Sequence, residues 1–198
     1  MTGCKVAIFL AGLLSLPALA STADDIAALE AAKHGHTPTP QTLRQVATVH
    51  PFSLPDGREV NMNNYALVLF MGGNCHYSAQ MDPPLKQLAA DKGLKVYAYT
   101  LDGGGDSSFP YPMLPRKSDP NAPIADEIMS FFGNGLPIAT PTVFMVNVNT
   151  MKAYPVSQGV MDMGVFSGRL ATVIAADVDN LSAAQLAPMP VGQTTSQQ

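Results

Sequence analysis

Two kinds of hydrophobic pattern alternate along this chain. A continuous apolar run at residues 66–71 has the length of a strand buried on both faces, as in a sheet covered by helices. A second run at residues 95–101 predicts another strand. The segment between them carries apolar residues at steps of four, four and three, which is typical of a helix: Tyr77, Met81, Leu85 and Leu88. This part of the chain therefore predicts a strand–helix–strand unit.

The same alternation continues toward the C-terminus. Helical spacing over residues 124–132 predicts a helix that ends at Gly133, and further strands are predicted at 142–148 and 153–160. A last helix is predicted over residues 163–174. The order strand, helix, strand, helix, strand, strand, helix predicts an α/β fold. Its central mixed sheet is expected to be mostly parallel, with an antiparallel hairpin at one edge.

The N-terminus has the pattern of a cleavable secretory signal. Lys5 gives a short positive start, residues 6–16 are mostly apolar, and Ala18-Leu19-Ala20 is a small-x-small exit. Residues 1–20 are therefore predicted to be a signal peptide that directs secretion of the protein. The alternative is an N-terminal membrane anchor, but the apolar run is well short of the roughly 20 residues that span a bilayer. No later segment is apolar enough to predict stable membrane insertion.

The rest of the chain divides by composition. Residues 21–48 predict a short amphipathic helix and a Pro/Thr-rich linker, and a globular domain is expected over residues 49–180. A turn signal at Asp56-Gly57 indicates a leading hairpin in this domain. Residues 102–123 are rich in Gly, Pro, Ser and Asp, which leaves open a lid over a site or a disordered loop. Residues 181–198 lack apolar periodicity and predict a disordered tail.

Charge and cysteine content exclude several classes of protein. With 11 Lys and Arg against 15 Asp and Glu, the formal net charge is −4, so nothing indicates nucleic acid as a partner. Two cysteines are too few for a disulfide-stapled miniprotein or a multi-thiolate metal site. His34 and His36 have no ligand cluster beside them, and the sequence predicts neither a metal nor a cofactor. Cys4 lies in the signal, so the mature chain keeps Cys75 alone.

Cys75 is the candidate nucleophile. It follows the strand at 66–71 at the point where a helix begins, and helix N-termini stabilise negative charge, which lowers the pKa of a thiol there. His76, if protonated, would add positive charge, and the hydroxyl of Ser78 could donate a hydrogen bond to the thiolate. The alternative is a buried structural cysteine. The polar, loop-like flanking residues favour the reactive thiol.

The segment around Cys75 resembles the active site of thioredoxin-like proteins. Residues 75–78 (Cys-His-Tyr-Ser) are similar to their C-x-x-C motif with the second Cys replaced by Ser. Pro83 matches the proline that kinks the active-site helix, and Thr140 and Pro141 match the cis-proline loop. In that fold the loop packs against the active-site cysteine and offers its backbone to the substrate. The resemblance therefore implies that Thr140 and Pro141 bind substrate, and we expect Tyr77 to line the same site.

Four longer segments resemble, in order, the TrbB-type proteins, which are periplasmic thioredoxin-like thiol-disulfide isomerases of F-type conjugative transfer systems: LVLFMGGNCHYS, DPPLKQLA, YTLDGGGDSSFP and ATPTVFMVNVNT. The resemblance covers roughly residues 50–175. It implies a thioredoxin-like fold with a central mixed sheet, helices on both faces and a cis-proline loop. It also implies a periplasmic protein that assists folding or assembly of pilus and transfer proteins, with cysteine-containing secreted clients as partners.

The sequence departs from this family at the position of the second cysteine. Ser78 cannot resolve a mixed disulfide, because a hydroxyl is not a redox partner, so a self-contained dithiol oxidoreductase is excluded. Cys75 can still isomerise disulfides if a thiol of the client, a small thiol or a redox partner protein releases it. Asn74 and Leu69 also differ, standing where thioredoxin has a Trp and a buried acid. Proton handling would then fall to His76, water or the substrate.

Two functions remain open. The first is a monothiol disulfide isomerase, and the second is a redox-inactive thioredoxin-fold chaperone or client-binding assembly factor. An accessible Cys75 with a depressed pKa favours the enzyme. A thiol that is inaccessible, or whose pKa is unperturbed, favours the binding protein.

Overall fold

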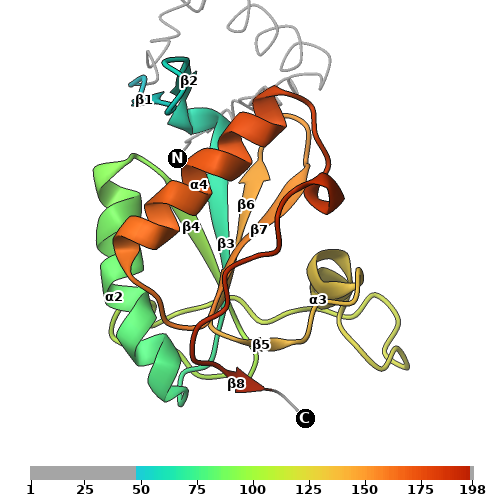
Figure 1. Ribbon diagram of the computed structural model, residues 1–198. Coiled ribbons are helices and arrows are strands. Elements are labelled where there is room, and N and C mark those ends of the chain that lie inside the picture. The colour runs from blue at the N-terminus through green and yellow to red at the C-terminus, as the bar shows by residue number, and fades with distance from the viewer. Residues whose placement is uncertain (1–47, 197–198) are drawn as a thin grey trace, which may run out of the picture. The chain divides into compact units, whose positions relative to one another are not determined.

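Figure 1 shows the computed structural model of the chain, which describes residues 48–196. The predicted signal peptide at 1–20 and residues 21–47 of the predicted helix-and-linker segment lie outside the described residues. The compact unit begins at Thr48, next to the predicted domain start. Within the described part, no helix is both long and apolar enough to cross a membrane.

A four-stranded mixed sheet lies at the centre of this unit (Figure 1). Its strands are β3 (Tyr65–Met71), β4 (Lys95–Thr100), β6 (Thr142–Asn147) and β7 (Ala153–Gln158), in the spatial order β4-β3-β6-β7. β3 pairs in parallel with β4 and antiparallel with β6, which pairs antiparallel with β7. The sheet is thus less parallel than predicted, because the long connection after β4 reverses the chain before it enters β6.

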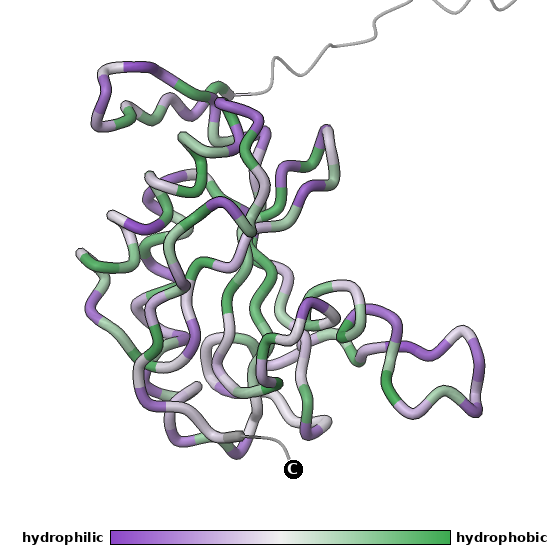
Figure 2. Tube along the Cα trace, turned by 45° about the vertical axis from the view of Figure 1, so that its right-hand side comes forward, coloured by the Kyte–Doolittle hydropathy of each residue, from purple (hydrophilic) through white to green (hydrophobic). Residues whose placement is uncertain are grey.

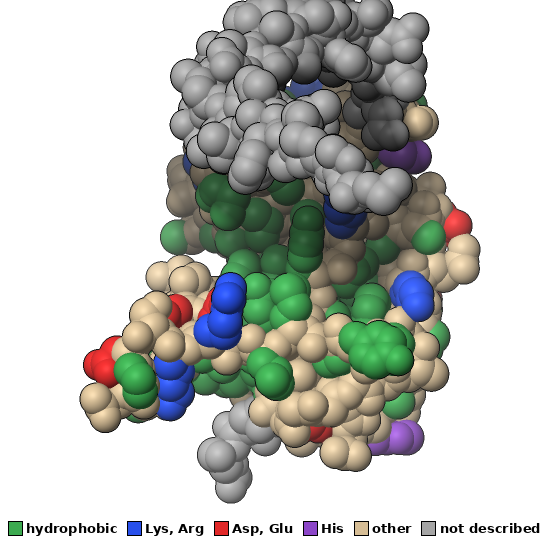
Figure 3. All heavy atoms as spheres, turned by 180° about the vertical axis from the view of Figure 1, so that it is seen from behind, with side chains coloured by type: hydrophobic (Ala, Val, Ile, Leu, Met, Phe, Trp, Pro, Cys, Tyr) green, Lys and Arg blue, Asp and Glu red, His purple; other side chains and the backbone are tan. Residues whose placement is uncertain are grey.

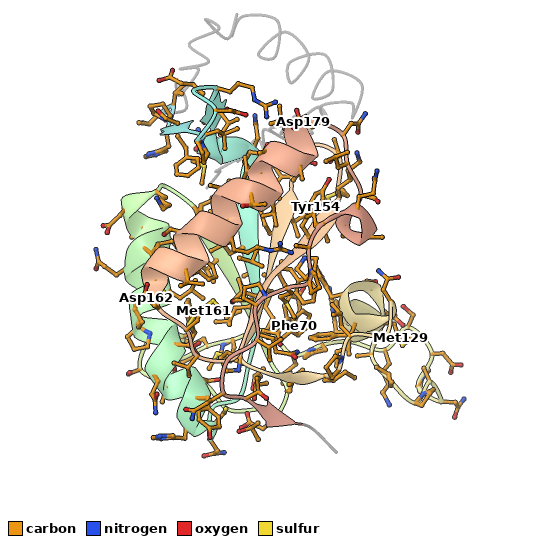
Figure 4. All side chains as sticks on the ribbon, in the orientation of Figure 1. Phe70, Met129, Tyr154, Met161, Asp162 and Asp179 are labelled. Atoms are coloured by element: carbon orange, nitrogen blue, oxygen red, sulfur yellow. The ribbon has the colours of Figure 1, made fainter. Side chains whose placement is uncertain are left out.

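The described residues form three α-helices, which cover both faces of the sheet. α2 (His76–Asp91) connects β3 to β4 and packs with α4 (Met163–Val178) over one face, while α3 (Asp126–Phe132) packs over the other (Figure 1). α4 begins after Asp162, whose carboxylate accepts hydrogen bonds from backbone N–H groups of the first turn (Figure 4). α3 ends at Gly133, as predicted. The element order and the two covered faces are those of the expected thioredoxin-like fold.

Alternate side chains of β3 point to opposite faces and build two hydrophobic clusters. Leu67, Leu69 and Met71 pack beneath α2 and α4. Phe70 packs on the side of α3 (Figure 4), where its ring contacts those of Tyr99, Phe131, Phe132 and Phe144. Every residue of β3 is buried, as the continuous apolar run predicts. Figure 2 shows the same hydrophobic character along the central strands.

The leading hairpin is confirmed. β1 (Pro51–Ser53) pairs antiparallel with β2 (Glu59–Asn61), and the turn between them contains Asp56-Gly57. Gly57 has a φ of 86°, a left-handed conformation that glycine adopts readily because it has no Cβ. A short 3-10 helix, η1 (Met62–Asn64), then leads directly into β3.

The long loop at residues 102–123 runs along the open edge of the sheet. Its residue Met113 pairs with β4: the N–H of Met113 donates to the carbonyl of Ala98 at 2.8 Å, and the N–H of Thr100 donates to the carbonyl of Met113 at 2.9 Å. The ammonium group of Lys86 in α2 donates to the carbonyl of Ser108 at 2.6 Å. The loop therefore has fixed backbone contacts that cover part of an otherwise unpaired strand edge.

The prediction of a disordered tail at 181–198 is wrong as far as residue 196. A short 3-10 helix, η2 (Ala183–Gln185), follows α4, and the chain then runs back to form β8 (Thr195–Ser196). β8 pairs antiparallel with a two-residue strand that sequence analysis did not predict, β5 (Ala139–Thr140). Ala183 and Leu186 pack against the main hydrophobic cluster, and beyond them backbone hydrogen bonds hold the segment. Such bonds leave no hydrophobic pattern in the sequence.

Candidate active site

Cys75 is the N-cap residue of α2. It has extended backbone angles (φ −85°, ψ 116°), and its Sγ accepts a hydrogen bond from the backbone N–H of Ser78 at 3.4 Å. The sulfur thus takes the place that a serine or aspartate oxygen normally fills at the start of a helix. Its side chain is only 8% exposed. The predicted position at a strand–helix junction is therefore found, and the thiol lies beneath the surface.

Two threonines from distant parts of the chain meet the sulfur. Cys75 Sγ lies 3.7 Å from the carbonyl oxygen of Thr140 and 3.4 Å from Oγ1 of Thr195. Burial raises the pKa of the Cys75 thiol, but hydrogen bonds that the sulfur accepts, among them those from the Thr195 hydroxyl and the N–H of Ser78, outweigh burial and lower the pKa below its ordinary value. The carbonyl of Thr140 can only accept a hydrogen bond, so it contacts the protonated thiol and does not itself favour the thiolate. The thiolate is therefore favoured by named hydrogen bonds in addition to the helix N-terminus.

Thr140 and Pro141 lie beside Cys75, as the family resemblance implied. Both residues are buried, and the peptide bond between them is cis. Thr140 belongs to β5 and is paired with Thr195 of β8, while the carbonyl of Pro141 accepts from the N–H of Gly159 at 2.7 Å. The backbone that a substrate was expected to meet is thus already occupied, at Thr140 by the chain's own C-terminal segment and at Pro141 by Gly159, which follows β7.

The other residues of the predicted site have different surroundings. Ser78 is fully buried, and its hydroxyl accepts a hydrogen bond from the N–H of Gly72 at 3.2 Å, which ties the helix to the end of β3. His76 is exposed and pairs with Gln80, with 2.6 Å between their Nε2 atoms. The described hydrogen bonds include none between His76 and Cys75. Tyr77 is half-buried, and its ring meets the edge of the His76 ring.

Pro83 lies inside α2, directly before Pro84. Both side chains are exposed, and α2 continues beyond them to Asp91. A proline removes one backbone donor from a helix interior and crowds the preceding turn. Its placement in the active-site helix is the one that the family resemblance implied.

Asp102 is a site residue that sequence analysis missed. Its carboxylate accepts hydrogen bonds from the backbone N–H groups of Gly73 and Asn74, each at 2.9 Å, and from Thr100 Oγ1 at 2.9 Å. Desolvation raises the pKa of Asp102, but these bonds and one from Gly104 outweigh it and lower the pKa to about 2. Asp102 therefore fixes the loop between β3 and Cys75, the N-cap residue of α2. The composition of residues 102–123, which contain it, leaves open only a lid or a disordered loop and gives no sign of this carboxylate's role.

Asp82 is a second missed residue. It lies one helical turn after Ser78, is fully buried, and neither carboxylate oxygen has a hydrogen-bond donor near it. Burial raises the pKa of Asp82 to about 8, with further contributions from the carboxylate of Asp106 and the charge of Cys75. A buried acid therefore exists near the thiol, although it comes from α2 and not from the position of Leu69. An acid on the apolar face of a predicted helix was the available signal.

An apolar cleft of about 460 Å³ lies next to the loop that contains Asp102. It is lined by Leu101, Leu114, Pro115, Ile124, Ile128 and Ile138. Figure 3 shows hydrophobic side chains gathered on the rear face of the molecule. In the part of the chain that the structure describes, no group of three or more His, Cys, Asp and Glu residues is placed to hold a metal ion.

Comparisons with known proteins place these features in context. The family described as "TraF: F plasmid transfer operon protein" matches residues 59–170. Protein TrbB of Escherichia coli (strain K12) is 41% identical over 169 residues, which are 82% of this chain and 88% of that protein.

Two solved structures are more distant. A thio-disulfide isomerase from Thermus thermophilus has a TM-score of 0.33 at 16% identity, over 68% of this chain and 95% of that chain. A hypothetical protein from Sinorhizobium meliloti has a TM-score of 0.37 at 16% identity, over 73% of this chain and 90% of that chain. Overlaps of this size carry no weight, so the fold rests on the strand order given above.

Replacing Asp102 by Asn should loosen the loop before Cys75. The variant loses the charge and one acceptor oxygen, so we expect the free energy of unfolding at neutral pH to fall by about 1 kcal/mol, because the carboxylate is partly open to solvent. The native carboxylate has a depressed pKa, so its contribution is full above about pH 4 and is lost as the pH falls toward 2. The difference between wild type and variant should therefore shrink in acid, measured by urea unfolding.

Asp91→Asn is the matched control, because Asp91 is exposed at the end of α2 and, among residues 48–196, its side chain bonds only to that of Gln87. Equal stability of the Asp102→Asn variant and the wild type at neutral pH would refute the role given to Asp102.

Replacing Asp82 by Asn should change how stability depends on pH. The pKa of Asp82 is raised in the folded state, so the folded protein holds a proton that the unfolded chain releases, and stability falls as the pH rises from about 4 to about 8. The slope should approach roughly 1.4 kcal/mol for each pH unit at mid-range, and Asp82→Asn should remove that component. Urea unfolding across this range measures it. Parallel stability curves for the two proteins would contradict the assignment.

Proposed function

Because this chain belongs to the TraF family of F plasmid transfer operon proteins, we propose that it is a conjugation-related thiol-disulfide isomerase that works through the single thiol of Cys75. The observation that carries the proposal is the setting of Sγ. It is held at the N-terminus of α2, against the carbonyl of Thr140, with a pKa below the ordinary value. A thiolate in such a setting is the attacking species of disulfide exchange.

The proposed reaction exchanges disulfides without net oxidation or reduction. The Cys75 thiolate attacks one sulfur of a client disulfide, the client S–S bond breaks, and a mixed disulfide forms while the second client sulfur leaves as a thiolate. A different client thiolate then attacks the client sulfur of the mixed disulfide. A new client disulfide forms, and Cys75 leaves as the thiolate. The client keeps its number of disulfides and its electrons, so no second thiol is needed on the enzyme.

Ser78 limits the reaction to this cycle. Its hydroxyl cannot attack the mixed disulfide, and it is engaged with the N–H of Gly72. When the client offers no suitable thiol, a small thiol or a redox partner protein must therefore release Cys75 from the mixed disulfide. Asp82 supplies what His76 does not: a buried carboxyl whose proton is coupled to the charge of Cys75.

The location and the clients are part of the proposal. The pattern of residues 1–20 favours export to the periplasm, where disulfides persist. The clients would be cysteine-containing secreted proteins of a conjugation apparatus, and the enzyme would assist their folding or assembly. After cleavage of the signal the protein would have no membrane-inserted segment and no nucleic-acid partner.

A second candidate function is a redox-inactive chaperone or client-binding assembly factor. The low exposure of Cys75 and the apolar cleft next to residue 102 favour it, since a cleft of about 460 Å³ can hold apolar client side chains. The two functions differ in whether the thiol is required.

Removing the thiol by Cys75→Ala tests the proposed function. We expect wild type to accelerate reactivation of scrambled ribonuclease above the buffer rate, and Cys75→Ala to return the rate to that of buffer. Ser107→Ala, at an exposed loop residue, is the control and should keep full activity. Equal reactivation by wild type and Cys75→Ala would remove the isomerase. Thiol-independent suppression of client aggregation would then support the binding function.

Restoring a second thiol by Ser78→Cys tests the placement of the site. The introduced thiol would lie in the first turn of α2, where the N–H of residue 78 already reaches Cys75 Sγ at 3.4 Å. We expect an internal disulfide under oxidising conditions and a gain of insulin reduction with dithiothreitol, because a dithiol can resolve its own mixed disulfide. Thiol counting before and after oxidation measures it, with Ser107→Cys as the control. Two persistently free thiols in Ser78→Cys would show that the site is wrongly placed.

A further inference from the structure

The chain's own C-terminal segment occupies the strand edge beside Cys75. β8 pairs antiparallel with β5, so that Thr195 lies opposite Thr140 and Ser196 opposite Ala139 (Figure 1). The same Thr195 places its Oγ1 at 3.4 Å from Cys75 Sγ. A backbone strand and a side chain of one segment thus meet both the edge of β5 and the candidate nucleophile.

The contact continues upstream along the end of β7. The N–H of Gln158 donates to the carbonyl of Pro190 at 3.1 Å, and the N–H of Gly192 donates to the carbonyl of Gln158 at 2.7 Å. The N–H of Val160 donates to the carbonyl of Gln193 at 3.0 Å. Residues 190–196 are therefore bound as an added strand, which is the mode by which many proteins bind extended peptides.

Glycine residues make this close approach possible. A Cβ placed on Gly192 would lie 1.9 Å from the carbonyl oxygen of Val160, so any other residue there must push the segment away. On the opposing side, a Cβ on Gly159 would lie 2.6 Å from the carbonyl oxygen of Gln193. The segment and its binding surface are thus matched in shape at the backbone level.

The segment is nevertheless held weakly by side chains. None of residues 187–195 is buried, and Val191 is 66% exposed, so the segment contributes little to either hydrophobic cluster. It carries no charged residue. Its attachment consists mainly of backbone hydrogen bonds, whose net contribution is small because water can replace them. Such a segment can leave without unfolding the domain.

We propose that residues 187–196 are a resident pseudosubstrate, which a client must displace before it reaches Cys75. The inference rests on the proposed function and specifies its substrate: an extended, uncharged client segment that adds to β5 as an antiparallel strand and places a disulfide sulfur where Thr195 Oγ1 lies. While the segment is bound, Cys75 is covered. When a client replaces it, the same backbone groups of β5 hold the client.

The test compares Gly192→Ala with Gly168→Ala in the chain without residues 1–20, a chain whose one cysteine is Cys75. Gly168 is an exposed glycine of α4 with open space around its Cβ position, so the two variants carry the same chemical change. We measure alkylation of Cys75 by iodoacetamide across a pH series. The plateau at high pH reports access to the thiolate alone, and the midpoint reports the pKa.

For Gly192→Ala we expect the plateau rate of alkylation to be at least about tenfold above that of wild type. The state in which residues 187–196 have left Cys75 would change from a minor to a major population. The midpoint should rise, because the hydrogen bond from Thr195 lowers the pKa of Cys75. Gly168→Ala should match wild type in both. A chain ending at residue 186, checked for folding by urea unfolding, should behave as Gly192→Ala does. A synthetic peptide of residues 187–198 should slow its alkylation again.

Equal plateau rates in wild type, Gly192→Ala and the shortened chain would overturn the pseudosubstrate. Failure of the proposed function has a different signature. In that case alkylation becomes faster in Gly192→Ala, but neither this variant nor the wild type reactivates scrambled ribonuclease.

Discussion

The chemistry proposed for this protein depends on the atom that caps α2. The sulfur of Cys75 accepts the hydrogen bond that a serine or aspartate oxygen normally accepts at the start of a helix. The loop after β3 that carries this cap is tied to α2 by the Ser78 hydroxyl, which accepts the N–H of Gly72, and a group from outside the helix holds its other residues. Asp102 does this by accepting the N–H groups of Gly73 and Asn74. Its low pKa keeps it ionised, so the clamp persists at any pH at which the thiol can react.

The charges around the thiol oppose one another. Hydrogen bonds from Thr195 and from the N–H of Ser78 favour the thiolate, whereas Asp82 is buried and resists ionisation. Because the two groups interact, ionising one makes ionising the other less favourable. The pKa of Cys75 is lowered and that of Asp82 is raised to about 8, so the site places a thiol that ionises more readily beside a carboxyl that holds its proton. Disulfide exchange uses such a pair: a nucleophile and a nearby proton.

Sequence patterns predict the elements that depend on local order. The buried run at β3, the helix steps of α2 and the position of Cys75 between them all follow from neighbours in the chain. His76 follows Cys75 directly in the chain, but adjacency does not place its ring at the sulfur. Successive helical residues point about 100° apart, and the ring of His76 is directed to Gln80. Asp102 acts on a loop 28 residues earlier in the chain. The tail is held by backbone groups that every residue has, so neither interaction leaves a periodic signal.

The covered thiol resolves a conflict that the proposed single-thiol isomerase would face. A thiol with a depressed pKa in an oxidising compartment is prone to form mixed disulfides, and the described residues contain no second cysteine to release them. Simple burial would protect the sulfur but abolish exchange. A strand held by backbone hydrogen bonds protects it reversibly, because a client strand can form the same bonds with β5. Protection of the thiol and recognition of a client then use the same edge of β5. Thr195 covers the sulfur of Cys75 and also lowers the pKa of its thiol. Displacing the C-terminal segment therefore leaves a thiol that is more accessible but has a higher pKa.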